Sequence, residues 1–240
     1  GNTRKPDGSL VTDADLAVDE LLIPALVAEY PTANVVSEER QVGQFSPEGA
    51  TILVDPIDGT SAFASGIPGF CISVGVIMNG QPVAGVVAAP AWGITWICDF
   101  DPDSPVLRGG CPLSRATSLR PFDRQSTVLV DSKLHRRYDL GAYAGRCRSF
   151  GSTALHLCLV ADNEAFSVAH SGRVYPWDVA GAHAIATRVG LKAELVSGGP
   201  LMYDSCLPDQ RLPDDILLGH PNHIAAFRAY MRQRSRQVSA

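Results

Sequence analysis

Residues 54–60, Val-Asp-Pro-Ile-Asp-Gly-Thr, place two carboxylates, Asp55 and Asp58, close together where an apolar run ends. Asp-Pro and Asp-Gly are also turn signals, so a plain tight turn is the alternative interpretation. A turn between a strand and a short helix would aim both carboxylates at one point and turn the N–H groups of Gly59 and Thr60 toward an anion. Carboxylates and backbone carbonyls are the ligands that Mg²⁺ prefers. The segment therefore predicts a divalent-cation site beside a phosphate.

Three other places contribute acids: Asp15, the pair Glu38-Glu39, and Asp178. Each also has an ordinary structural interpretation. Asp15 completes a T-x-x-D capping box with Thr12. The glutamate pair is typical of a solvated loop, and Asp178 suits a helix N-terminus. Acids dispersed over several elements are nevertheless what hydrolysis of a phosphate ester by two metal ions requires, because both the attacking and the leaving oxygen need stabilisation.

The patterning predicts elements that carry these acids. A helix is expected from Asp13 to Tyr30, kinked at Pro24. The clearest hairpin joins strands 72–78 and 81–89 through Asn79-Gly80. Further strands are expected at 35–36, 51–54, 94–98, 126–130 and 165–169, and further helices near 152–161, 178–189 and 222–233. Hairpins mixed with covering helices predict one layered α+β domain over residues 1–240, with approximate halves 1–118 and 119–240.

The composition is that of an ordinary globular protein, with 45% hydrophobic and 19% charged residues and a net charge of −5. The sequence has no cluster of basic residues of the kind that binds nucleic acid. It also has no apolar run that approaches the roughly 18 residues needed to span a membrane. The N-terminal residues also lack the apolar core of a signal peptide. The six cysteines form no C-x-x-C pair, and several lie in apolar runs, as free thiols do in a reducing compartment. We expect a cytoplasmic protein that binds neither nucleic acid nor membrane.

The sequence resembles the inositol monophosphatase family, which includes inositol phosphatases, some fructose bisphosphatases and 3'(2'),5'-bisphosphate nucleotidases. The resemblance rests on four pieces in family order, at residues 11–15, 37–39, 55–60 and 177–181. It implies a layered αβαβα sandwich of the inositol monophosphatase and fructose-bisphosphatase type. It also implies two Mg²⁺ ions, with a weaker third ion near Asp15 and the Lys5 loop, and a homodimer.

The same resemblance implies roles for individual residues. The metal ligands would be Glu38, Asp55, the Ile57 carbonyl, Asp58 and Asp178. The residues that orient the attacking water would be Thr60, Glu38 and Asp15. The substrate would meet Asp58, Gly59, Thr60, Ser152, Thr153 and the position of Ser171. Trp177 would pack beneath the site and fix Asp178, whereas His156 and His183 are interpreted as structural.

Ser171 departs from the inositol-specific members, in which a glutamate at this position binds inositol hydroxyls. Inositol monophosphate is therefore in doubt as the natural substrate. His170 and Arg173 could serve a second phosphate, or lie exposed in a hairpin turn. The leading hypothesis is an Mg²⁺-dependent phosphatase acting on a small polyol or sugar phosphate monoester. The alternative is a 3'(2'),5'-bisphosphate nucleotidase, and a non-catalytic regulatory protein of the same fold is the remote one.

Overall fold

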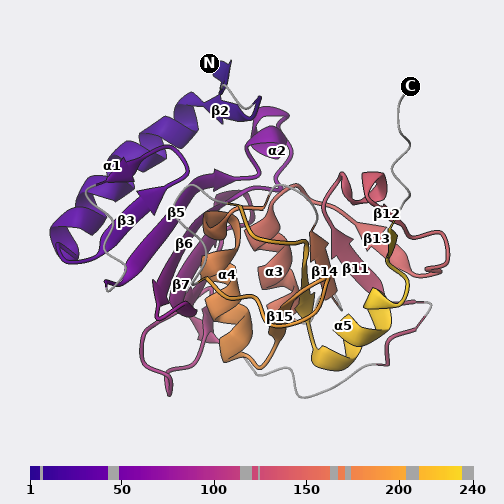
Figure 1. Ribbon diagram of the computed structural model, residues 1–240. Coiled ribbons are helices and arrows are strands. Elements are labelled where there is room, and N and C mark those ends of the chain that lie inside the picture. Colours follow the sequence, from indigo (N-terminus) through magenta and orange to yellow (C-terminus); the bar gives the residue numbers. More distant parts are fainter. Residues whose placement is uncertain are drawn as a thin grey trace.

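The computed structural model describes residues 1–5, 8–42, 49–113, 121–123, 125–162, 167–170, 174–203 and 211–233 (Figure 1). The first half forms an eight-stranded sheet in the order β10-β9-β8-β7-β6-β5-β3-β4. Its strands are β3 (Asn34–Ser37), β4 (Gln41–Val42), β5 (Thr51–Asp58), β6 (Cys71–Met78), β7 (Gln81–Ala89), β8 (Ile94–Cys98), β9 (Leu107–Arg108) and β10 (Cys111–Pro112). Only β3 and β5 pair in parallel among these described strands.

The predicted hairpin is confirmed as β6 and β7. Asn79 and Gly80 have φ values of 49° and 69°, so both take the left-handed conformation that two-residue hairpin turns favour. The turn joins Met78 to its cross-strand partner Gln81. The pairing shifts register between Val76 and Ile77, so the turn and this irregularity together determine which residues of β6 face the helices.

A second, five-stranded sheet has the order β13-β11-β14-β16-β15. Its strands are β11 (Thr127–Val130), β13 (Arg146–Arg148), β14 (Ser167–His170), β15 (Lys192–Leu195) and β16 (Ile216–Gly219). Two small antiparallel pairs complete the sheets: β1 (Asn2–Arg4) with β2 (Leu10–Thr12), and β12 (Tyr138–Asp139) with β17 (Arg232–Gln233).

Helices lie between and outside the two sheets (Figure 1). The helices α3 (Thr153–Ala161) and α4 (Pro176–Arg188) fill the space between the sheets, α4 against β6 and β7 and α3 against β14 and β16. On the outer faces, α1 (Asp13–Glu29) packs on β3 and β5, and α5 (Pro221–Arg228) packs on β14 and β16. The predicted αβαβα layering is confirmed.

Glycines bring α4 unusually close to the first sheet. A Cβ added at Gly75 of β6 would lie 2.4 Å from the backbone nitrogen of Gly181, and one at Gly181 would lie 2.5 Å from the Val74 carbonyl oxygen. Real side chains do not tolerate such distances, so helix and sheet meet backbone to backbone here. This contact fixes the height of α4, whose first turn carries Asp178.

One helix prediction needs a correction. Helix α1 contains Pro24 and runs to Glu29, as the sequence predicts to within one residue, and the kink expected at Pro24 stays a prediction. The predicted closing helix 222–233 is wrong at its end, because α5 stops at Arg228 and the chain continues into β17. There Gln233 pairs with Tyr138, and Tyr230 and Met231 pack against a buried cluster. Tertiary pairing has overridden the helical pattern. Among the described helices none is long and apolar enough to cross a membrane.

Candidate active site

An irregularity at the end of β5 places Asp55 and Asp58 on one face of the sheet. Residues an odd number apart normally point to opposite faces of a strand. Here Asp55 pairs with Ser73 and Asp58 pairs with Cys71, so the β5 segment holds one residue more than its partner segment on β6. A bulge of this kind re-aims a side chain. Since Cys71 and Ser73 are two apart on β6, their partners share the face that α4 covers.

Three acids from different elements meet beside this bulge. Single carboxylate oxygens of Glu38, Asp55 and Asp178 lie within 4.8 Å of one another. The amide of Glu38 donates to the Val54 carbonyl at 2.9 Å and so continues the pairing of β3 with β5. Asp178 lies in the first turn of α4 and accepts from the Tyr175 amide at 2.8 Å. This all-oxygen donor set fits a hard divalent cation such as Mg²⁺.

The electrostatics of the cluster favour cation binding. Burial, followed by repulsion between the carboxylates, raises the pKa of Asp55 and of Asp178 well above the ordinary aspartate value. Both side chains therefore resist carrying their charge while no positive group lies between them. A divalent cation would remove that penalty, because it favours the ionised form of each ligand.

Asp58 has partners that differ from those of the three clustered acids. Its Oδ2 accepts from Ser152 Oγ at 2.7 Å and from the Ala154 amide at 2.6 Å, and the Thr153 amide also donates to this carboxylate. Burial raises the pKa of Asp58 to about 7, against the lowering effect of these hydrogen bonds. Asp58 thus joins the end of β5 to the first turn of α3, which carries the predicted substrate residues Ser152 and Thr153.

Asp15 completes the predicted capping box and also contacts Thr60, whereas its part in catalysis stays a prediction. Asp15 Oδ2 accepts from the Thr12 amide at 2.8 Å and completes the predicted capping box at the start of α1. Its Oδ1 faces Thr60, whose hydroxyl lies 3.2 Å from it and 3.0 Å from the Ile57 carbonyl. The buried Asp15 therefore caps a helix and also orients Thr60 at the start of α2 (Thr60–Ala64).

The glutamate pair is not a freely solvated loop. Lys5 Nζ donates to Glu38 at 2.9 Å and to Glu39 at 2.7 Å, which ties the N-terminal segment to the acid cluster. Burial lowers the pKa of Lys5, but attraction to the two glutamates outweighs it and the net shift is upward. Burial raises the pKa of Glu39, although Lys5 opposes this. Sequence reasoning missed Lys5 as a partner of both acids.

Close backbone packing fixes the segment that holds Ser152. Gly59 has φ 94°, and a Cβ there would lie 2.8 Å from the Gly69 carbonyl oxygen. A Cβ at Gly69 would lie only 1.7 Å from the Phe150 carbonyl oxygen. The amide of Phe150 donates to Nε2 of the buried His156 at 2.8 Å. These contacts hold the segments that contain Gly59, Gly69 and Phe150 against one another beside Asp58. They agree with the interpretation of His156 as a structural residue.

Other predicted residues are placed as follows. Trp177 is buried and stacks on Tyr175 with ring centroids 4.8 Å apart. His183 is buried, with its Nδ1 3.1 Å from Tyr203 Oη. Ser171 and Arg173 lie outside the described residues, and so does the side chain of His170. Sequence reasoning interpreted Cys71 only as a buried free thiol and missed its place beside Ser152, whose Oγ lies 3.2 Å from the Cys71 Sγ.

Comparisons with known proteins point to one family. The model of the inositol monophosphatase family matches residues 1–212. The 3'(2'),5'-bisphosphate nucleotidase CysQ of Escherichia coli is 28% identical over 211 residues, which cover 83% of this chain and 81% of CysQ. Inositol monophosphatase 2 of Saccharomyces cerevisiae is 30% identical over 198 residues, covering 75% and 68% of the two chains.

Solved structures give the same result. The crystal structure of inositol monophosphatase-II from Staphylococcus aureus has a TM-score of 0.74 at 26% identity, covering 89% of this chain and 79% of that one. An IMPase/NADP phosphatase complexed with Mg²⁺ and phosphate shares the fold, with a TM-score of 0.81 at 15% identity and coverage of 99% and 89%. The chain belongs to the inositol monophosphatase family and is a phosphatase that hydrolyses phosphate monoesters.

Proposed function

We propose that this member of the inositol monophosphatase family is an Mg²⁺-dependent phosphatase acting on a small polyol or sugar phosphate monoester. The convergence of Glu38, Asp55 and Asp178 beside the β5–α2 turn carries this proposal. A 3'(2'),5'-bisphosphate nucleotidase is the second candidate, because CysQ is among the relatives that match most of the chain.

The chain offers ligands for two ions. Glu38, Asp55 and the carbonyl of Ile57 would hold one, and Asp55, Asp58 and Asp178 would hold the other. When bound, such ions supply positive charge for the phosphoryl oxygens and lower the pKa of bound water. The carboxylates must come from different elements, because a single segment cannot surround two cations. Asp15, close to the Lys5 segment, would contribute to a weaker third ion.

Thr60 is suited to orient the attacking water. Its hydroxyl has one proton and two acceptors within reach, the Ile57 carbonyl oxygen at 3.0 Å and Asp15 Oδ1 at 3.2 Å. The Thr60 oxygen then presents its lone pairs to a proton of the water, with Glu38 as a second acceptor. A threonine is too weak a base to remove that proton by itself, so its contribution is positioning.

The substrate would span the distance between two helix starts. The phosphate would lie against Asp58 and the amides of Gly59 and Thr60, where the chain turns from β5 into α2. The alcohol would lie toward Ser152 and Thr153 at the start of α3. Asp58 accepts hydrogen bonds from the Ser152 hydroxyl and from the Thr153 amide. One carboxylate would therefore couple the phosphate position to the alcohol position.

The cellular location and the oligomeric state of the enzyme are inferred from its cysteines and from its family. The five described cysteines, at 71, 98, 111, 147 and 158, form no disulfide, which supports a cytoplasmic location. The family resemblance supports a homodimer. Size-exclusion chromatography with light scattering measures the oligomer, and a monomer at micromolar concentration would contradict that inference.

A phosphate-release assay tests the proposed function. The panel is inositol phosphates, fructose 1,6-bisphosphate, histidinol phosphate and adenosine 3',5'-bisphosphate, each with Mg²⁺ and with excess EDTA. We expect turnover with Mg²⁺ alone, because clustered acids cannot bind an anionic ester without cations. Full turnover in EDTA would overturn the metal mechanism. Preference for the adenosine bisphosphate would favour the nucleotidase, and inactivity on every ester would favour a regulatory protein.

A further inference from the structure

Arg211 is held in a defined position at the start of α4. Its Nε donates to Tyr175 Oη at 3.1 Å, and its guanidinium carbon lies 5.5 Å from the centre of the Tyr175 ring. The Tyr175 ring stacks in turn on Trp177, with an interplanar angle of 5°. The amide of Leu212 donates to the Val174 carbonyl at 2.9 Å. Side chain and backbone together therefore fix Arg211 beside Tyr175.

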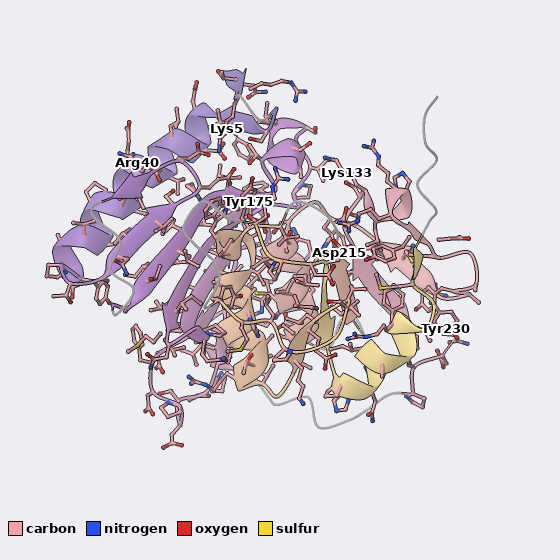
Figure 2. All side chains as sticks on the ribbon, in the orientation of Figure 1. Lys5, Arg40, Lys133, Tyr175, Asp215 and Tyr230 are labelled. Atoms are coloured by element: carbon pink, nitrogen blue, oxygen red, sulfur yellow. The ribbon has the colours of Figure 1, made fainter. Side chains whose placement is uncertain are left out.

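Tyr175 connects Arg211 to the proposed metal site. The backbone amide of Tyr175 donates a hydrogen bond to Asp178 Oδ2 at 2.8 Å. The backbone of Tyr175 therefore contacts a candidate metal ligand, while its ring contacts the Arg211 guanidinium. Lys5, which is labelled with Tyr175 in Figure 2, donates to Glu38 of the same acid cluster at 2.9 Å. Arg211 is thus separated from Asp178 by about one tyrosine side chain and one hydrogen bond. Pentoses and hexoses that carry two phosphates span a comparable length.

Arg211 has no carboxylate partner among the described residues, as is also true of Arg146 and Arg188, which bond backbone carbonyls. Four others pair with carboxylates: Arg40, Arg108, Arg137 and Arg228. Arg211 is exposed, and its Nε is occupied by a neutral phenol rather than an acid. Its two terminal nitrogens keep the parallel donor geometry that binds a phosphate through two hydrogen bonds. In a chain with a net charge of −5, a fixed cation beside the site favours an anionic ligand.

We propose that Arg211, held by Tyr175, binds a second phosphate group of the substrate and so determines specificity for bisphosphates over monophosphates. This inference rests on the proposed phosphatase function and names the substrate class of the same site. The first phosphate lies on the acid cluster, and the sugar bridges to Arg211. Since the interaction is made equally in the ground state and the transition state, it lowers KM and leaves kcat unchanged.

Steady-state kinetics on matched substrate pairs test the proposal. The pairs are fructose 1,6-bisphosphate with fructose 1-phosphate, and adenosine 3',5'-bisphosphate with adenosine 3'-phosphate. For Arg211→Gln we expect KM to rise about tenfold to a hundredfold for the bisphosphate of the preferred pair, as for loss of charged hydrogen bonds. The KM of its monophosphate and both kcat values should stay within about twofold.

Three further variants separate recognition from folding. Arg211→Lys keeps the charge but not the paired donors, so it should recover part of the bisphosphate KM. Tyr175→Phe keeps the ring stack and removes the anchoring hydroxyl, and should raise the bisphosphate KM by a smaller factor. Arg146→Gln on β13, which is exposed and bonds only a backbone carbonyl in the described structure, is the matched control and should change neither substrate.

Two outcomes would overturn the proposal. If Arg211→Gln raises KM equally for both members of a pair, Arg211 does not select the second phosphate. If the bisphosphate KM is unchanged, Arg211 does not contact the substrate, although the phosphatase function itself stands. A wild-type protein without turnover on any ester in Mg²⁺ would instead refute the proposed function, and this inference with it.

Discussion

Asp55→Asn should abolish phosphatase activity and, at the same time, stabilise the metal-free protein. Asp55 Oδ1 accepts from the Ile57 amide at 3.0 Å, and an asparagine oxygen can keep that hydrogen bond. What the substitution removes is therefore the charge. Activity is lost because an amide is a poor ligand for two dications. Stability rises because one of several mutually repelling, buried acids is neutralised.

The geometry of the acids gives the magnitude. Two unit charges 4.8 Å apart repel by about 3.5 kcal/mol at an effective dielectric constant of 20. Protonation relieves part of this repulsion, since the pKa of Asp55 is raised in the folded state. We therefore expect a net gain of about 1–3 kcal/mol at pH 8, or roughly 2–10 °C in Tm for a chain of this size.

The sign of the pH dependence is fixed by the raised pKa. An aspartate in the unfolded chain ionises above about pH 4. In the folded protein, Asp55 either keeps its proton or is repelled by the other ionised carboxylates of the cluster. The stability of metal-free wild type should therefore fall as pH rises above that value, and the fall should be smaller in Asp55→Asn. Asp55→Asn should therefore raise the free energy of unfolding of the metal-free protein more at pH 8 than at pH 5.

Thermal unfolding in EDTA and in Mg²⁺ measures both effects. Mg²⁺ at a hundred times its Kd should stabilise wild type by about 2.7 kcal/mol and Asp55→Asn far less. Asp215→Asn is the matched control, because buried Asp215 bonds Arg137 at 2.6 Å and Tyr138 at 2.5 Å. Loss of the Asp215 charge should lower the free energy of unfolding, which is the opposite of the effect expected for Asp55→Asn in EDTA. If Asp55→Asn in EDTA were less stable than wild type, the repulsion account would be refuted.

Three more predictions follow from single contacts. Thr60→Ala should lower kcat by about 10²–10⁴-fold while Mg²⁺ affinity by calorimetry stays nearly unchanged; a loss of metal affinity would make Thr60 part of the metal loop. Ser152→Ala removes the hydroxyl that accepts from the Leu155 amide and donates to buried Asp58, and should cost about 2–3 kcal/mol in urea unfolding, whereas the exposed Ser65→Ala should cost little. Burial lowers the pKa of His183 to about 4, below its unfolded value near 6.5, so wild-type stability should fall as pH drops through this interval, by about 3 kcal/mol in total. His183→Gln should flatten that part of the stability profile, and an unchanged profile would show that His183 is not the group responsible.

The sequence allowed the predictions that depend on local chemistry. Thr12 and Asp15 fix the start of α1, and Asn79-Gly80 fixes a hairpin, because each contact closes within a few residues. The layered fold followed from strands and helices of recognisable period. The acids at Glu38, Asp55 and Asp178 were singled out by residue type and family resemblance, and the structure brings their oxygens together.

Features that depend on distant contacts were not predictable in this way. The alternation of a strand puts Asp55 and Asp58 on opposite faces, and only the pairing with β6 reveals the bulge that reverses this. The end of the last helix depends on pairing between Tyr138 and Gln233, which are far apart in sequence. Lys5 and Arg211 gave no signal as partners, since a cation finds its partner through the fold rather than through spacing.

Glycines set the position of the proposed substrate residues without any chemistry of their own. At Gly69 the chain passes so close to Phe150 that a Cβ would overlap its carbonyl oxygen, at 1.7 Å. Phe150 is bonded to His156, and two residues further along Ser152 bonds Asp58. Backbone contact among three segments therefore sets the distance between the proposed phosphate and alcohol positions. We expect a substrate of different length to require those segments to separate, so that backbone packing contributes to selectivity together with the side chains proposed to touch the substrate.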